Sequence, residues 1–142
     1  MRRKTSRVKA MQALFQIDVG HISPEKAICY TFNIEQITDS ANEFGPSLVL
    51  GVLENIETID NLISNKSPEW GLKRMASVER SVLRIAVYEL LFTKDTPYRV
   101  IINEAIELAK SFGDHESGAF VNGVLDEIWR TCNHKAKDQL GV

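Results

Sequence analysis

The sequence lacks the features of a membrane protein or of a disulfide-stabilised secreted protein. No apolar run approaches the roughly 18–20 residues needed to cross a bilayer. The basic N-terminus is not followed by the apolar segment and small-residue cleavage site of a signal peptide. The two cysteines, Cys29 and Cys132, have neither CxxC spacing nor a histidine cluster nearby. We therefore expect a cytoplasmic protein with two free thiols and no membrane association.

The sequence also lacks a recognisable catalytic or cofactor-binding motif. It contains no glycine-rich loop for phosphates or dinucleotides and no G-x-S-x-G nucleophile motif. His21, His115 and His134 lie far apart, without metal-ligand spacing. Arg84 and Glu89 lie in an apolar segment, where pairing with each other or with other helices explains them better than catalysis. We expect no enzymatic activity and no bound metal or cofactor.

Length and composition are those of an ordinary globular protein. The chain has 142 residues, of which 44% are hydrophobic and 25% charged, enough to bury a core without a metal or disulfide. The polar, turn-rich segment Ser64–Pro68 divides the chain nearly in half. This boundary predicts two small helical subdomains, residues 1–64 and 65–142.

Apolar residues recur at helical spacing along the chain and predict an all-α fold of about six to seven helices. In the first half, one helix is expected to end at Gly20, and Ser23 is expected to cap the next. Ser40 and Glu43 fit a capping box for a third helix, although Pro46 would make that helix begin or bend later. Apolar residues from Val49 to Ile63 then follow on one face.

The second half contains the most apolar helix of the chain. Ser77 is expected to cap this helix, which is apolar almost all round and therefore predicted to be the buried centre of the fold. Thr96 and Pro97 should begin the next helix, which Gly113 should end. Asp114 is expected to cap the last helix. Gly123 within that helix costs about 1 kcal/mol relative to alanine, so a close approach of another helix is expected there.

Positive charge is concentrated at the N-terminus, whereas the rest of the chain is acidic. Residues 1–9, here called the basic arm, carry five basic side chains and no acid. The remaining chain holds 12 of the 17 lysines and arginines against all 19 acidic residues. This distribution predicts one local polyanion site, because most of the surface would repel polyanions. The five side chains are Arg2, Arg3, Lys4, Arg7 and Lys9.

Helical spacing groups several of these side chains. Arg3 and Arg7 are four residues apart and Lys4 is adjacent, so one helix face is expected to present three cations. Gln12 lies about one turn further along, displaced around the helix, where it could reach a base edge or a phosphate. Trp70, in the connection from residue 64 to 73, is the only nearby loop candidate for base stacking. Composition alone does not distinguish RNA from DNA or from an acidic protein as the ligand.

Four stretches of the sequence resemble the NusB family of bacterial transcription antitermination factors. The first has an arginine-rich opening, although Val8 stands where many members have a glutamate. The last two stretches are long and specific, and the resemblance is strongest from Val78 to Asp126. The stretches are RRKTSRVKAMQALFQ, WGLKRMASVERSVLRIAVYELL, PYRVIINEAIELAKSFG and FVNGVLD.

The resemblance implies an all-α protein of two helical subdomains that performs no catalysis. It implies binding of boxA-type single-stranded RNA from ribosomal RNA operon leaders, together with the small-subunit ribosomal protein NusE. The pair would act in the RNA polymerase antitermination complex. The resemblance assigns to RNA the matching basic residues and Gln12, and it places the NusE surface on the second subdomain. The matching basic residues are Arg3, Lys4 and Arg7. The candidates for the NusE surface are Glu79, Glu116 and Phe120.

Alternatives exist at both sites. Glu79 and Glu116 could instead complement the partial positive charge of helix N-termini, and Phe120 could belong to the core. The basic arm could serve homodimerisation of a helical interaction protein rather than RNA binding. A role as an accessory to an RNA-modifying enzyme is less well supported, because the chain lacks a glycine-rich cofactor loop.

Overall fold

The computed structural model describes residues 2–66 and 71–139. The regular secondary structure of this part consists of seven α-helices and two short 3-10 helices, with no strand. Trp70 and the adjoining residues 67–69 of the connection lie outside the described residues. The expected all-α class and helix number are confirmed. The helices are α1 (Arg3–Gly20), α2 (Pro24–Phe32), η1 (Ile37–Asp39), α3 (Phe44–Glu54), α4 (Ile56–Lys66), η2 (Leu72–Arg74), α5 (Ser77–Phe92), α6 (Tyr98–Phe112) and α7 (Ser117–Gln139).

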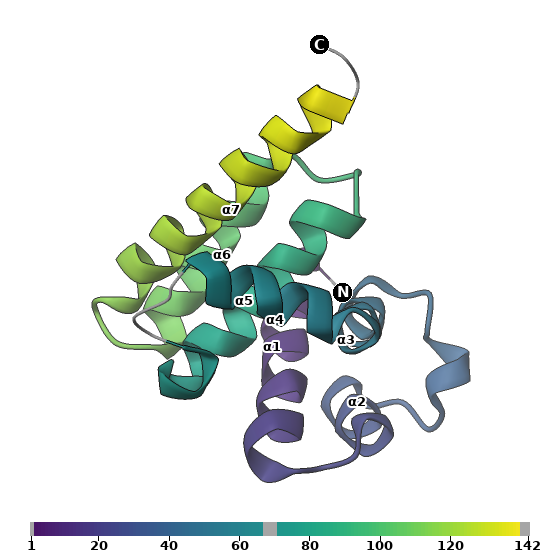
Figure 1. Cartoon of the computed structure of the whole chain (residues 1–142). Helices are drawn as coiled ribbons and strands as arrows, with labels where there is room; N and C mark the ends of the chain where they lie inside the picture. Colours follow the sequence, from purple (N-terminus) through teal and green to yellow (C-terminus); the bar gives the residue numbers. More distant parts are fainter. Residues whose placement is uncertain (1, 67–70, 140–142) are drawn as a thin grey trace.

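Helix α5 lies at the centre of the fold, as its nearly uniform apolar sequence predicts (Figure 1). It packs against α1, α3, α4, α6 and α7. Helices from both halves therefore contribute side chains to one apolar core, which includes Leu14, Val52, Leu83 and Leu125. Helix α4 ends at Lys66, two residues beyond the predicted boundary at Ser64. The division into two subdomains stays a prediction.

Several predicted helix ends are confirmed. His21 adopts a left-handed backbone conformation (φ 53°) directly after Gly20, which ends α1. The Ser23 hydroxyl accepts a hydrogen bond from the backbone N–H of Lys26 and caps α2. Gly113 ends α6, and the Asp114 carboxylate caps α7.

Other predicted ends are wrong by a residue or more. Helix α3 begins at Phe44, with Pro46 in its first turn, and Ser40 ends the preceding 3-10 helix instead of forming a capping box. Helices α5 and α6 have Ala76 and Pro97 at their N-caps, so neither Ser77 nor Thr96 holds the N-cap position.

The apolar face from Val49 to Ile63 belongs to two helices rather than one. The helical conformation is interrupted at Asn55. The side-chain amide of Asn55 donates a hydrogen bond of 2.8 Å to the Gly51 carbonyl. The same carbonyl also accepts a hydrogen bond of 3.1 Å from the Asn55 backbone N–H. The break lets α3 and α4 pack separately against α5.

The close helix approach expected at Gly123 is absent, since a Cβ atom built there meets nothing within 4 Å. Instead, α3 and α5 approach closely at Gly51, where a Cβ atom would overlap the Tyr88 ring. Glycine spacing along the sequence does not reveal which glycine faces a neighbouring helix.

Candidate nucleic-acid interface and partner pocket

The first turn of α1 exposes the leading residues of the basic arm. Arg2, the N-cap residue of α1, and the adjoining Arg3 and Lys4 are all exposed. Helix α1 begins at Arg3, so these cations lie at its N-terminal end. This arrangement agrees with the expectation that the charges lie on a structured element.

Arg7 does not lie on this exposed surface, contrary to the expected face of three cations. Its residue exposure is only 4%, and its guanidinium donates two hydrogen bonds of 2.9 Å to the two carboxylate oxygens of Glu89 in α5. The reason is helical geometry, because Arg7 shares a face with Met11 and Leu14, and both of these are buried. Arg7 thus ties the arm to the central helix.

The electrostatics of Arg7 match this buried pairing. Burial lowers the pKa of the guanidinium, but the hydrogen bonds and negative charge of Glu89 outweigh that effect, helped by Glu104 and Asp95. The pKa of Arg7 is consequently raised above its ordinary value. The guanidinium also lies over the Phe44 ring, 5.1 Å from its centroid. The sequence predicts that Glu89 requires a partner, and the structure shows that this partner is Arg7.

Arg3 joins the arm to the turn between α5 and α6. Its guanidinium donates hydrogen bonds to Asp95 (2.8 Å) and to the Thr96 hydroxyl (2.9 Å). The same group lies 4.4 Å from the centroid of the Phe44 ring. The side chain is still half-exposed, and a guanidinium has five N–H donors, so it retains capacity for a phosphate. The hydrogen bond from Arg3 is the main cause that lowers the pKa of Asp95.

The last two predicted RNA-binding residues lie further along α1. Lys9 is half-buried, and its ammonium donates a hydrogen bond of 3.3 Å to the Thr31 carbonyl at the end of α2. Gln12 is exposed. The structure thus gathers Arg2, Arg3 and Lys4 at one end of α1 and places Lys9 and Gln12 apart from them.

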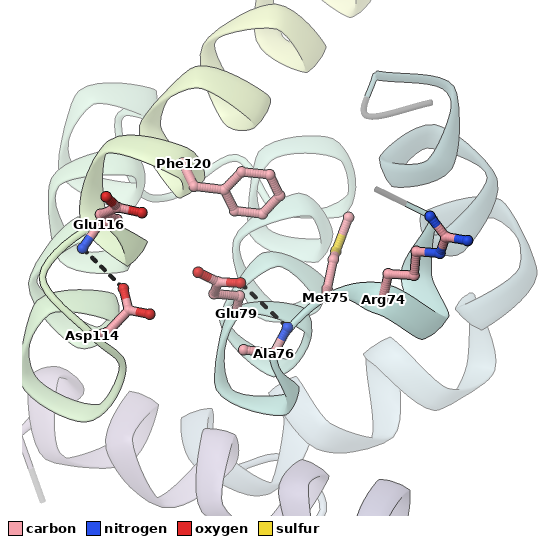
Figure 2. Close-up of a pocket in the computed structure, with 7 residues that line it drawn as sticks. All are labelled: Arg74, Met75, Ala76, Glu79, Asp114, Glu116 and Phe120. Carbon is pink, nitrogen blue, oxygen red and sulfur yellow. Dashed lines mark hydrogen bonds between the residues drawn. The ribbon is translucent and has the colours of Figure 1, made fainter. Parts of the chain in front are cut away.

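The three residues considered for partner binding line one pocket. Glu79 projects from the first turn of α5, whereas Glu116 and Phe120 come from the start of α7 (Figure 2). The cavity measures about 430 Å³. Its remaining lining residues are Arg74, Met75, Ala76 and Asp114.

Glu79 also has a structural role in this pocket. Its carboxylate accepts hydrogen bonds from the Ala76 backbone N–H (3.3 Å) and from the Ser117 hydroxyl (2.8 Å). These bonds connect the N-terminus of α5 to that of α7. Glu79 therefore complements a helix N-terminus, as in the alternative raised above, and borders the pocket as well.

Glu116 and Phe120 differ from Glu79 in their surroundings. Glu116 is exposed, and its backbone N–H donates a hydrogen bond of 2.9 Å to Asp114. This bond is the main cause that lowers the pKa of Asp114. Phe120 is half-buried and packs on the core, with its ring directed into the pocket (Figure 2). The pocket therefore combines carboxylates with an accessible apolar floor.

Within the described parts of the chain, no group of three or more histidine, cysteine or acidic side chains could hold a metal ion. No helix there is long and apolar enough to span a membrane. The fold and its two surfaces define an all-helical binding protein with a cationic helix end and a separate acidic, apolar pocket.

Comparison with known proteins places this chain in a family. The model of the NusB family matches residues 4–130, and the chain therefore belongs to the NusB family. The transcription antitermination proteins NusB of Bacillus thuringiensis (strain Al Hakam) and Bacillus cereus (strain B4264) are each 48% identical to it over 129 residues. That alignment covers 90% of this chain and 97% of each relative. The family consists of non-catalytic antitermination factors, so this chain is an antitermination factor and not an enzyme.

Solved structures show the same fold. T. maritima NusB superposes with a TM-score of 0.82 at 39% identity, covering 92% of both chains. A chain from a crystal structure of the antitermination factors NusB and NusE in complex with double-stranded RNA gives a TM-score of 0.77. It is 30% identical, with 91% of this chain and 96% of that chain covered. The resemblance and the fold class expected from the sequence are confirmed.

Proposed function

We propose that this chain binds boxA-type single-stranded RNA of ribosomal RNA operon leaders together with the small-subunit ribosomal protein NusE. The complex would act on RNA polymerase in the cytoplasm. Family membership supports this role, as does the solved complex of a related NusB with NusE and RNA. The observation that carries the proposal is the exposed cationic end of α1 on an otherwise acidic protein.

The RNA surface is centred on Arg2, Arg3 and Lys4. Their exposure leaves them accessible to phosphates, and Arg3 offers a planar donor group suited to phosphate geometry. Lys9 and Gln12 lie further along α1, at the margin of this surface. Arg7 acts as a positioning residue, because its buried pair with Glu89 fixes the helix that carries the exposed cations.

The protein partner is proposed to occupy the pocket between α5 and α7. Three carboxylates there outnumber the one cation, Arg74, and Phe120 supplies apolar surface. The carboxylates are those of Glu79, Asp114 and Glu116. An acidic pocket with an apolar floor complements a basic ribosomal protein and repels RNA phosphates. The RNA and NusE would therefore contact different surfaces of the chain.

The RNA assignment is tested by measuring binding of a boxA RNA and a scrambled RNA, with and without NusE. An Arg3→Ala/Lys4→Ala variant should lose affinity, whereas a Lys26→Ala/Lys110→Ala variant removes equal charge from exposed sites elsewhere. The proposal is supported if boxA RNA binds more tightly than scrambled RNA, and if this preference is lost without NusE and in the Arg3→Ala/Lys4→Ala variant. Equal binding of both RNAs by all variants contradicts it. Sedimentation of the same samples detects arm-mediated homodimers, the alternative role of the arm.

The partner assignment is tested separately by titrating NusE into Glu116→Ala and Glu107→Ala variants. Both glutamates are exposed, but only Glu116 borders the pocket. Weaker NusE binding by the Glu116 variant alone supports the proposed surface. Equal affinity of the two variants contradicts it.

A further inference from the structure

Phe92, the last residue of α5, presents an aromatic ring to solvent. It is 45% exposed, and its ring stacks on Tyr88 with 5.6 Å between centroids and 22° between planes. Tyr88 is half-buried where it packs against Gly51 of α3. The ring of Phe92 is therefore supported from beneath while much of its surface stays accessible.

The cationic end of α1 lies beside this segment. Arg3 donates its hydrogen bonds to Asp95 and Thr96, which follow Phe92 by three and four residues. Lys94, which lies between Phe92 and Asp95 in the sequence, is exposed. The fold thus brings the turn that follows Phe92 to the basic arm, although almost ninety residues separate them in sequence.

Surfaces that bind single-stranded nucleic acids combine cations along the backbone with aromatic rings on which bases stack. The basic arm contains no aromatic residue of its own. The Phe44 ring beside the arm is half-buried and covered by the guanidinium groups of Arg3 and Arg7, whereas Phe92 offers an exposed ring. The charges for the flanking phosphates come from Arg3, Lys4 and Lys94. Their positive charge favours a nucleic acid over a basic protein at this position.

A protein partner at Phe92 is less consistent with the geometry. The proposed NusE pocket includes Glu79 near the start of α5, whereas Phe92 ends that helix. Thirteen residues of α-helix separate the two, or about 20 Å at a rise of 1.5 Å per residue. The ring therefore extends the cationic surface and lies well away from the acidic pocket.

We propose that Phe92 is a stacking platform for a base of the bound single-stranded RNA. The proposal rests on the function proposed above and adds a contact to it. A stacked base contributes affinity largely independent of sequence, since every base has a π-face. The platform thus adds to affinity, whereas boxA preference arises at other contacts.

The test compares Phe92→Leu, Phe92→Trp and Val19→Ala in binding a boxA-type single-stranded RNA together with NusE. Leucine keeps apolar packing on Tyr88 but removes the aromatic face, and tryptophan retains it. Val19 is a control for the loss of exposed apolar surface, since it is 46% exposed and lies near the end of α1, about 24 Å along the helix from Arg3. Thermal unfolding of each variant verifies that it is folded.

We expect Phe92→Leu to weaken binding by about tenfold, as for the loss of one stacked base. Phe92→Trp and Val19→Ala should bind like wild type. The dependence of affinity on salt should stay unchanged in Phe92→Leu, because no phosphate contact is lost. Equal affinities of Phe92→Leu and Val19→Ala would overturn the proposal.

The failure of this inference is distinguishable from failure of the proposed function. If Arg3→Ala/Lys4→Ala loses RNA affinity while Phe92→Leu does not, the platform is refuted and the RNA site stands. If neither variant loses affinity, the RNA site itself is wrong. If Phe92→Leu loses NusE affinity in the absence of RNA, Phe92 belongs to a protein interface and the inference is overturned.

Discussion

Arg7 in α1 and Glu89 in α5 form a buried ion pair joined by two hydrogen bonds of 2.9 Å, with side-chain exposures of 5% and 2%. The pair links the helix that carries the basic arm to the central helix of the fold. Each side chain compensates the charge of the other, which would otherwise be buried without a partner. The position of the proposed RNA surface thus depends on a contact that is itself buried.

Removal of either partner should strongly destabilise the protein. Arg7→Ala or Glu89→Ala leaves one buried charge unpaired, and the expected loss in free energy of unfolding is about 3–5 kcal/mol. Urea denaturation followed by circular dichroism measures this loss. The double variant Arg7→Ala/Glu89→Ala should lose less than the sum of the two single variants, because no uncompensated charge remains. Additive losses would show that the two side chains do not interact.

Arg7 and Arg3 should differ in how they affect the salt dependence of RNA binding. Each phosphate contact with single-stranded RNA contributes about −0.7 to the slope of log affinity against log salt. Arg3→Ala should reduce the slope by about that amount. Arg7→Lys keeps the positive charge but cannot donate the two parallel hydrogen bonds to Glu89. This variant should lower the free energy of unfolding and leave the salt dependence of RNA binding unchanged. Anisotropy titrations at several salt concentrations measure both slopes, and a smaller slope in Arg7→Lys would place Arg7 on RNA.

The sequence predicted the class of fold and the exposed part of the arm because both depend on local pattern. Apolar periodicity identified α5 as the central helix, and charge counting identified the arm. The burial of Arg7 had a local signal that was missed, since Arg7 shares its helix face with the apolar residues Met11 and Leu14. Had this face been followed to the N-terminus, the unexplained Glu89 would have been a natural partner.

Contacts between distant segments had no such signal. The approach of Arg3 to Asp95 and the break at Asn55 both depend on how helices pack, which spacing along one helix does not encode. The placement of the turn after Phe92 beside the arm is of the same kind. Equally, Gly123 and Gly51 both interrupt apolar helices in the sequence, and only the three-dimensional packing shows that Gly51 is the crowded one.

Asp95 should titrate below its ordinary pKa of 3.8, mainly because Arg3 donates a hydrogen bond to its carboxylate. Since the folded-state pKa is depressed, the ionised carboxylate favours the folded state. This contribution is fully present above pH 3.8 and is lost as the pH falls through the lower folded-state value. Carboxyl carbon NMR shifts measured against pH report the titration directly.

The cause of this depression is tested in an Arg3→Ala variant. There the Asp95 pKa should rise toward its ordinary value. The pKa of Asp114, lowered mainly by the Glu116 backbone N–H, should stay depressed in the same variant and serves as an internal control. An Asp95 pKa that does not change would mean that the contact with Arg3 is not maintained in solution.

Alanine substitution at Gly51 and at Gly123 should change stability in opposite directions. At Gly51 the added methyl group overlaps the Tyr88 ring, which is rigid and stacks on Phe92, so the ring cannot withdraw without disturbing its neighbours. Overpacking of this kind costs about 1–3 kcal/mol. At Gly123 the methyl group enters open space, and the higher helix propensity of alanine should stabilise α7 by about 0.5–1 kcal/mol.

Thermal and urea unfolding of both variants test this pair of expectations. The Gly51→Ala variant should also weaken RNA binding, because displacement of Tyr88 moves the support beneath Phe92, whereas Gly123→Ala should bind RNA like wild type. Restoring space with Gly51→Ala/Tyr88→Leu should recover part of the stability, since leucine lacks the ring atoms that meet the new methyl group. A Gly51→Ala variant as stable as Gly123→Ala would show that α3 and α5 are not in close contact at Gly51.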